Sequence, residues 1–513
     1  MPNKKMKTKI LFISMYGIEN NAARLFSAIL KNNNYDPEII FFKNWKNNNI
    51  KEPTSLEFNL LFGEIAKIKP DIIGISFGSP YFNIVKNISH RIKQEFKNIY
   101  LVFGGIHATT TPEDCIPHCD ALCIGEGDEV FPEFVKKFDS KDDFTDTPNF
   151  WFNTKEQIIK NELAPLVKNL DELPFKDLSD DRKYYIDYNK IYYGDPILKI
   201  KEFRISASRG CLYRCAYCYN SILSKIYPEE SQYYRIRSVE NVITEILYAK
   251  KHFKSVKRIK FDDDTFISDA GWVDEFCEKY KNLINIPFDI MLSPNMLNYE
   301  NLKKLKNAGL VRVQMGIEGA SAKENTENYN RAFFKDKIHN FSIENKKLKL
   351  DVVYDIIIDN PLTKESEKEE LFLFLLDLKS NFKLFMYSLA FFPKTLITET
   401  FLKNGLITAD DIEGNNTKCF YQFRASFDYP RTKTELFYFC MFVLASKSFI
   451  SKTIKTYIFY SPFFRKNIGL TVLIAKICNL MTISLIFVKM FVNGELSAVK
   501  LREYGTFKKI LTQ

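Results

Sequence analysis

The stretch SRGCLYRCAYCYN, residues 208–220, places three of the chain's ten cysteines close together. Cys211, Cys215 and Cys218 have the spacing C-x3-C-x2-C, and Tyr217 and Tyr219 stand on either side of the last thiol. Where cysteines stay reduced, a cluster of this kind indicates metal binding or catalysis more than disulfide formation. The loop is therefore the first candidate site, and the rest of the sequence has to fit around it.

The distribution of charge along the chain narrows the classes of partner. The net charge is +10, but residues 431–513 hold 13 Lys+Arg against 3 Asp+Glu, whereas residues 1–430 hold 60 of each sign. This pattern argues against a broad nucleic-acid-binding surface. It predicts that the basic tail binds a partner of its own. The opening residues MPNKKMKTKILFIS contain only a short apolar run and no small-residue cleavage site, so we expect a first strand and a cytoplasmic protein.

The ligand chemistry of three clustered thiols favours an iron–sulfur cluster. A structural zinc site takes four ligands, and no fourth cysteine or histidine is near; a disulfide would leave one thiol over. A cubane cluster held by three protein thiolates has one iron open to a small molecule. The spacing therefore suits a cluster that does chemistry on its fourth ligand.

Residues 1–140 alternate apolar runs with amphipathic stretches, which predicts a doubly wound, Rossmann-like parallel sheet. Ligands of such sheets bind at the carboxyl ends of the strands, where glycine lets a backbone approach closely. Residues 141–200 have little periodicity and predict a linker. The predicted strand ends and their neighbourhood supply these candidate contacts: Ser76, Gly104, Gly105, His107, Gly125, Glu126 and Gly127.

Residues 201–395 contain six strand-like runs separated by helical patterns, which predicts a partial (βα)6 barrel. Chemistry in such barrels lies at the carboxyl ends of the strands. The cysteine loop follows the first predicted strand, and thiols, carboxylates and glycines gather at the later ends. Residues 396–513 contain two strongly apolar runs, 435–445 and 468–492, and predict a mostly helical, basic region.

The cysteine loop resembles the cluster loop of the radical SAM enzymes. The resemblance implies that Cys211, Cys215 and Cys218 bind a [4Fe-4S] cluster as catalytic metal ligands, and that the open iron takes the amine and carboxylate of S-adenosylmethionine (SAM). The aromatic residue that usually precedes the third cysteine is present. Further residues that the resemblance assigns to SAM and its surroundings are Tyr217, Asp263, Asp264, Ser293, Gly316 and Glu318.

A second triplet competes with the first as a metal site. Cys115, Cys119 and Cys123 have similar spacing in CIPHCDALC. The segment DALCIGEG is a predicted strand, however, so Cys123 should face the core. We expect small buried thiols here rather than a second cluster.

Residues 7–400 together resemble the cobalamin-binding class of radical SAM enzymes, through PDIIGIS, GGIHATTTPE, GEGDEVFPEF and LDELPF. The resemblance implies a cobalamin domain over residues 1–140 and a radical SAM barrel over 201–395. One feature departs from the best-known cobalamin motif: SMYGIENNA stands where D-x-H-x-x-G would follow the first strand. The cofactor is therefore expected to lack a lower histidine ligand.

The function that this resemblance implies is cleavage of SAM to a 5′-deoxyadenosyl radical and methylation of an unactivated carbon, with an electron donor such as flavodoxin or ferredoxin. A non-methylating reaction such as oxidative ring closure and a non-catalytic iron–sulfur protein remain open; a helical tail argues against a methylthiotransferase. The substrate, small or lipid-like, is not named by any residue set. The tail predicts either peripheral contact with a membrane surface or a helical cap on the barrel.

Overall fold

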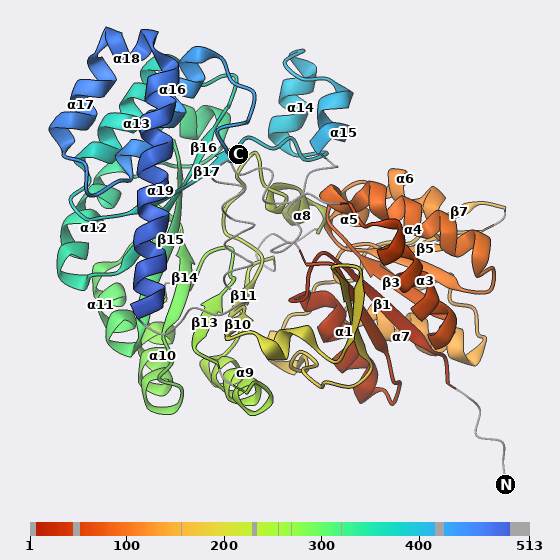
Figure 1. Ribbon diagram of the computed structural model, residues 1–513. Coiled ribbons are helices and arrows are strands. Elements are labelled where there is room, and N and C mark those ends of the chain that lie inside the picture. The colour runs from red at the N-terminus through yellow and green to blue at the C-terminus, as the bar shows by residue number, and fades with distance from the viewer. Residues whose placement is uncertain are drawn as a thin grey trace. The chain divides into compact units, whose positions relative to one another are not determined.

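The computed structural model describes residues 7–44, 52–154, 156–227, 233–254, 256–267, 269–319, 321–415 and 425–492 (Figure 1). The chain forms two compact units. The first comprises Met1–Ile267, Glu278–Ile286 and Phe391–Tyr421, and the second comprises Ser268–Cys277, Pro287–Ala390 and Gln422–Gln513.

The first unit contains the doubly wound sheet that the sequence predicts. Five parallel strands run in the order β5-β4-β3-β1-β2, so the chain reverses direction across the sheet between β1 and β3. Ligands of such sheets bind outside the carboxyl ends of strands at this reversal. The strands are β1 (Ile10–Met15), β2 (Glu38–Phe42), β3 (Ile72–Ser76), β4 (Tyr100–Gly104) and β5 (Ala121–Cys123).

Helices cover both faces of this sheet, which is why its strands are apolar on both sides. Along β1, Phe12 packs into one core and Ile13 into the other. Helices α1 (Asn21–Asn32) and α7 (Val130–Ser140) complete the first core, and α3 (Ser55–Ile68) and α4 (Phe82–Glu95) complete the second.

The expected linker over residues 141–200 is only partly a linker. Strands β6 (Phe150–Asn153) and β7 (Ile158–Lys160) extend one edge of the first sheet, and β8 (Lys183–Asp187) and β9 (Lys190–Tyr193) extend the other. These strands are three to five residues long, too short for an alternating pattern to stand out. The edges of the existing sheet supply their hydrogen-bond partners, so the strands form where local sequence gives little signal.

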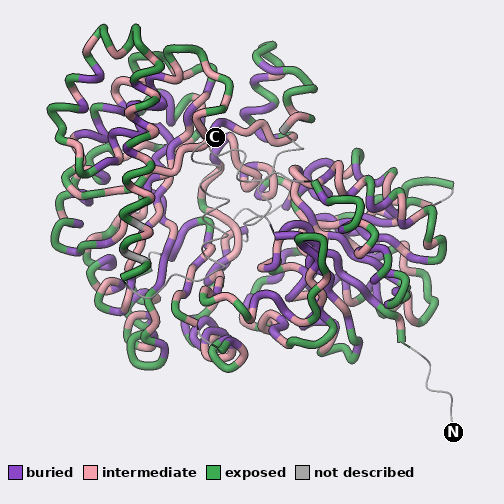
Figure 2. The backbone as a smooth tube through the Cα atoms, viewed as in Figure 1, coloured by how far each residue is buried: buried purple, intermediate pink, exposed green. Residues whose placement is uncertain are grey.

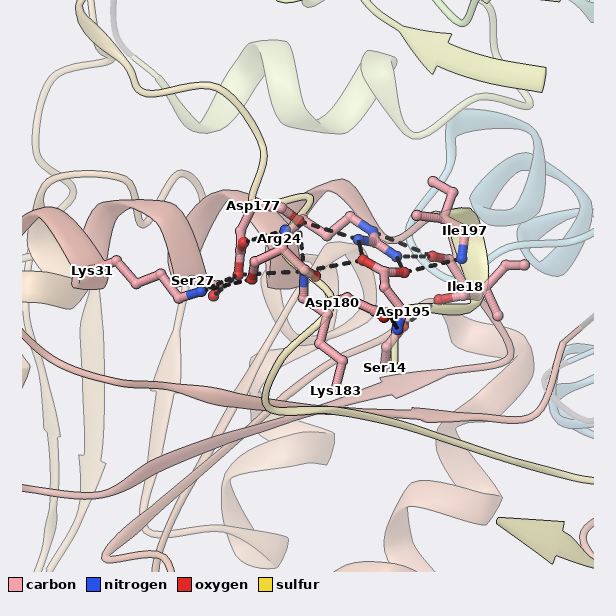
Figure 3. Close-up of polar contacts among 12 residues, drawn as sticks. Ser14, Ile18, Arg24, Ser27, Lys31, Asp177, Asp180, Lys183, Asp195 and Ile197 are labelled. Atoms are coloured by element: carbon pink, nitrogen blue, oxygen red, sulfur yellow. Dashed lines mark hydrogen bonds and ion pairs between the residues drawn. The ribbon is translucent and has the colours of Figure 1, made fainter. Parts of the chain in front are cut away.

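A buried group of charges fixes this segment to α1 (Figure 3). The guanidinium of Arg24 is fully buried and donates to both carboxylate oxygens of Asp195, at 2.5 and 2.7 Å. Lys183 Nζ lies 3.0 Å from Asp195 and 3.4 Å from Asp177, which also accepts from Ser27. The two buried cations and two buried carboxylates balance, which is the condition under which charges tolerate burial. The half-buried Lys31 also pairs with Asp177, at 3.1 Å.

We expect Asp195→Asn to destabilise the first unit by about 3–5 kcal/mol, because the substitution leaves two buried cations sharing one carboxylate. The measurement is urea unfolding of the anaerobically purified protein, followed by circular dichroism. Asp146→Asn is the control: Asp146 pairs with Lys137 on the surface, and its loss should cost less than about 1 kcal/mol. Equal shifts of the two midpoints would contradict the role of the buried group.

The strand–helix repeat predicted for residues 201–395 is present. In the first unit β10 (Glu202–Ile205) pairs in parallel with β13 (Arg258–Phe261), and α9 (Val239–His252) lies between them in sequence. In the second unit four strands pair in parallel and in chain order. They are β14 (Phe288–Leu292), β15 (Leu310–Glu318), β16 (Asp351–Ile358) and β17 (Lys383–Ser388), with α11 (Tyr299–Ala308), α12 (Lys335–Leu348) and α13 (Glu365–Asp377) between them.

The carboxyl-terminal region is helical, as predicted. Helices α14 (Leu396–Lys403) and α15 (Ala409–Asn415) belong to the first unit. The second unit ends with α16 (Lys433–Ala445), α17 (Lys452–Tyr460), α18 (Pro462–Lys466) and α19 (Ile468–Val492). The part of the predicted tail from residue 493 onward lies outside the described residues.

Candidate cluster and cofactor site

The cysteine loop lies between β11 (Ser208–Arg209) and α8 (Asn220–Ile226), directly after β10. Gly210 has φ +80°, and a side chain there would run into the carbonyl of Tyr233, so only glycine turns the chain into the loop. The N–H of Cys218 donates to the carbonyl of Cys215 at 3.0 Å, which closes a turn that carries both thiols. The backbone therefore fixes where the loop begins and how its second half folds.

None of the three cysteines is in a disulfide; Cys215 is buried and the other two are half-buried. Burial raises the pKa of the Cys218 thiol to about 12, so its proton leaves readily only in exchange for a metal. Among the described residues no three His, Cys, Asp or Glu side chains converge on one ion. A cubane cluster does not need ligands that converge on one ion, because each thiolate binds a different iron and the thiols surround the cluster. The loop thus fits an iron–sulfur cluster.

The two acidic residues predicted to meet SAM are placed differently. Asp263 is buried, accepts from Ser208 Oγ at 2.5 Å and from the N–H of Ala207 at 3.2 Å, and has its pKa raised by burial to about 6. Asp264 is exposed and accepts from Asn220 Nδ2 at 3.0 Å. Asp263 therefore braces the ends of β10 and β13, while Asp264 presents the accessible carboxylate beside the cysteine loop.

A hydrogen-bonded chain that the sequence prediction missed joins the cysteine loop to the first sheet. Tyr219 Oη lies 2.5 Å from Ser79 Oγ, and Ser79 Oγ lies 2.8 Å from Nδ1 of His107. The ring of Tyr219 also packs against Phe392, with centroids 4.9 Å apart. Ser79 follows β3 and His107 follows β4, so the loop is held at the carboxyl ends of these strands. The sequence feature that could have indicated this contact is the tyrosine directly after Cys218.

His107, predicted as a cofactor contact, is 1% exposed. Its imidazole lies beside the rings of Phe77 and Phe82, with centroids 5.8 and 4.4 Å away, and burial lowers its pKa to about 4. The ring is therefore neutral at pH 7, and its polar contacts are with the hydroxyls of Ser79 and Thr111. A direct contact with a cofactor stays a prediction.

The glycines at the strand ends serve packing within the protein, which the sequence prediction did not foresee. At Gly105, with φ +89°, a Cβ would lie 2.8 Å from backbone atoms of Phe77. At Gly125, with φ +73°, the hydroxyl of Tyr227 fills that space. A Cβ at Gly127 would lie 2.8 Å from Phe26. Neighbouring protein atoms therefore explain the glycines at 105 and 125, and a contact of any of the three with a cofactor stays a prediction.

Ion pairs clamp the loop after β5 to the strands beside the cysteines. Arg235, in β12 (Arg235–Ile236), donates to both oxygens of Glu126, at 2.5 and 3.0 Å. Arg209 donates to Asp128 at 2.7 and 3.1 Å. Tyr227 Oη accepts the N–H of Glu126 at 2.9 Å. The carboxylate of Glu126, predicted to meet a cofactor, is thus occupied by a guanidinium.

The second cysteine triplet is divided between the two cores, as buried structural thiols would be. Cys115 and Cys119 pack on one face of the first sheet and Cys123 packs on the other. Burial raises the pKa of Cys115 and of Cys123 to about 12. Thiols on opposite faces of a sheet cannot share one cluster.

In the second unit the predicted residues lie at strand ends. Ser293 follows β14 and is buried. Arg331, which the sequence prediction missed, donates to the carbonyl of Gly316 at 2.8 Å and lies 3.6 Å from Glu318 Oε1. Glu318 has φ +57°, which turns the chain away from β15. Arg431 holds Asp359, after β16, through two bonds of 2.6 Å.

Comparison with known families agrees with this arrangement. Residues 18–135 match the B12 binding domain, and residues 205–366 match the Radical SAM superfamily. The chain belongs to the cobalamin-binding class of radical SAM enzymes. The Radical SAM match contains the three cluster cysteines and Tyr219, and the B12 binding match contains the hydrogen-bonded partners Ser79 and His107.

Three proteins are similar to this radical SAM protein. An uncharacterized methyltransferase of Pyrococcus horikoshii is 28% identical over 282 residues, 53% of this chain and 58% of the relative. An anaerobic magnesium-protoporphyrin IX monomethyl ester cyclase of Rubrivivax gelatinosus is 26% identical over 273 residues, 50% of this chain and 45% of the relative. The cobalamin-dependent SAM radical enzyme OxsB, with aqua-cobalamin and SAM bound, has a TM-score of 0.65 at 15% identity, over 98% of this chain and 83% of that one.

The first sheet of this radical SAM protein has a small pocket on one face. The pocket is mostly apolar and lies over β3 and β4, lined by Ser76, Gly104 and the aromatic rings of Phe12, Phe26 and Phe131. Ser76 and Gly104 are therefore the predicted contacts that line a pocket.

Replacement of Cys211, Cys215 or Cys218 by Ala should abolish both the iron–sulfur absorbance and SAM cleavage after anaerobic reconstitution, because each thiolate holds one iron. The triple variant of Cys115, Cys119 and Cys123 to Ser should keep its iron content per folded protein. Iron analysis and visible absorbance measure both. Loss of about half the iron in the triple variant would contradict the assignment of a single cluster.

Proposed function

We propose that this chain is a cobalamin-dependent radical SAM methyltransferase that methylates an unactivated carbon of a small-molecule or lipid-like substrate. One observation carries the proposal: the cysteine loop is hydrogen-bonded, through Tyr219 and Ser79, to the ligand-binding edge of the sheet that matches the B12 binding domain. A single chain thus joins the regions for the two cofactors that such a reaction needs. The methyltransferase relative supports the same reaction class.

When bound, a reduced cluster supplies the electron that cleaves SAM, and cobalamin supplies the methyl group. The chain's own residues bind and orient these cofactors. The three thiolates hold the cluster with one iron left open. Asp264, exposed beside the loop, is suited to accept hydrogen bonds from the SAM ammonium group, and Asp263 keeps the adjoining strand end in place. Flavodoxin or ferredoxin is the proposed electron donor.

The test is a labelling experiment with the reconstituted holoenzyme. The enzyme, cobalamin, a reducing system and SAM with a deuterated methyl group are incubated anaerobically with a small-molecule and lipid extract of the source cells. We expect a product that carries one deuterated methyl group and that is missing with Cys215→Ala. If SAM is cleaved and no extract component acquires the label, the methyltransferase proposal fails.

A second reaction, oxidative ring closure, is favoured by the similarity to the cyclase. The same incubation separates the two reactions. Ring closure would give an unlabelled product with altered hydrogen content, together with 5′-deoxyadenosine, whereas methylation incorporates the label. An iron–sulfur protein without catalysis would yield neither product.

We further propose that bound cobalamin has no protein nitrogen below the cobalt. The segment after β1 contains no histidine, and the nearest candidate, His107, is buried with Nδ1 engaged by Ser79. Imidazole is a strong cobalt ligand, and its nitrogen would split the electron paramagnetic resonance lines of cobalt(II). We expect no such splitting. Splitting that disappears in His107→Ala would overturn this prediction and make His107 the ligand.

A further inference from the structure

The longest helix of the second unit, α19, has exposed positions along its whole length (Figure 2). Many of them are large apolar residues. Their exposed fractions rise toward its end, from 38% at Leu470 to 76% at Val492. The residues recur every three or four positions, the period of one helix face. We call them the α19 stripe: Leu470, Leu473, Ile477, Leu480, Met481, Leu485, Val488, Phe491 and Val492.

The opposite face of α19 carries small or polar residues and packs on α16. Thr471 and Ala475 are fully buried, and Cys478 is nearly so. Lys447 Nζ donates to Asn479 Oδ1 at 2.6 Å across this contact. In a helix that meets water, the apolar stripe faces the protein and the polar face meets solvent. Here the order is reversed, as in helices that pack together through small residues and face lipid.

The helix is long and apolar enough to cross a membrane, and only 17% of the stretch Ile468–Leu485 is buried inside the protein. Its contact with α16 fixes it along the side of the second unit. Lys476 Nζ lies 5.4 Å from the centre of the Phe427 ring, so this cation is turned to the protein rather than across the stripe. A helix held along one side by its own domain can lie in a bilayer surface, with the stripe inserted among the acyl chains.

The charge around the stripe identifies the kind of surface. Residues 446–492 contain seven Lys+Arg and no Asp or Glu. Lys452, Arg465 and Lys466 are exposed, whereas Lys447 and Lys455 are buried and Lys476 is turned to the protein. Basic residues beside an apolar helix face attract anionic lipid headgroups, at about 1 kcal/mol for each cation near the surface. The first 430 residues have balanced charge, so the attraction is confined to this end of the chain.

We propose that the α19 stripe docks the protein on an anionic membrane surface, with the helix in the plane of the membrane. This inference is independent of the proposed reaction, since it involves no cluster or cofactor residue. It chooses between the two expectations for the tail: α19 does pack on the second unit, and its outer face still lacks protein cover among the described residues.

The experiment is vesicle flotation with the full-length holoenzyme. Vesicles of phosphatidylcholine alone are compared with vesicles that contain one third phosphatidylglycerol, at low and high salt. We expect the protein to float with the anionic vesicles at low salt and to be partly released by high salt. The variant Leu473→Glu/Leu485→Glu/Val488→Glu should lower the bound-to-free ratio at least tenfold.

The matched control makes the same chemical change where exposed apolar residues stand alone. Leu283, Ile343 and Leu406 are 50%, 40% and 42% exposed, and their triple substitution by Glu should leave the bound-to-free ratio within twofold. Each variant is compared at equal iron content and equal unfolding midpoint. A wild-type protein that floats with neither vesicle, or that forms a dimer through the stripe without floating, overturns the proposal. Resistance to alkaline extraction from membranes would overturn the in-plane placement.

Discussion

The ion pairs between the strands beside the cysteine loop and the loop after β5 are the contacts on which the candidate site depends. Arg235 holds Glu126 and Arg209 holds Asp128, with Arg235 and Asp128 both less than 10% exposed. Charges with so little access to water are tolerated only as pairs, so the loss of one partner is costly. The pairs therefore fix the cysteine loop against the first sheet before any cluster, SAM or cobalamin binds.

Much of this arrangement could be predicted from the sequence, because its signals are local. The cysteine spacing, the apolar strands of the first sheet and the strand–helix repeat each appear within a few residues. The partners of Tyr219 could not be predicted, since Ser79 and His107 lie more than 100 residues away. For the same reason the close approach of the Tyr227 hydroxyl to Gly125 could not be predicted. The edge strands β6 to β9 were missed because the sheet, rather than their own pattern, determines them.

The carboxyl-terminal region illustrates a further limit of pattern analysis. The sequence identifies the apolar run 468–492, but it cannot tell which of its side chains face a core and which face outward. The burial of Thr471 and Ala475 against α16 decides the orientation. The cysteine loop and the α19 stripe are thus far apart in the sequence.

The central claim is that three cysteines hold a cluster whose fourth iron is open to SAM. Electron paramagnetic resonance of the reconstituted, reduced protein tests it most directly, with and without SAM. The account predicts the signal of a reduced [4Fe-4S] cluster whose g-values shift when SAM is added, because SAM becomes a ligand of the open iron. A spectrum that does not change with saturating SAM would contradict the account.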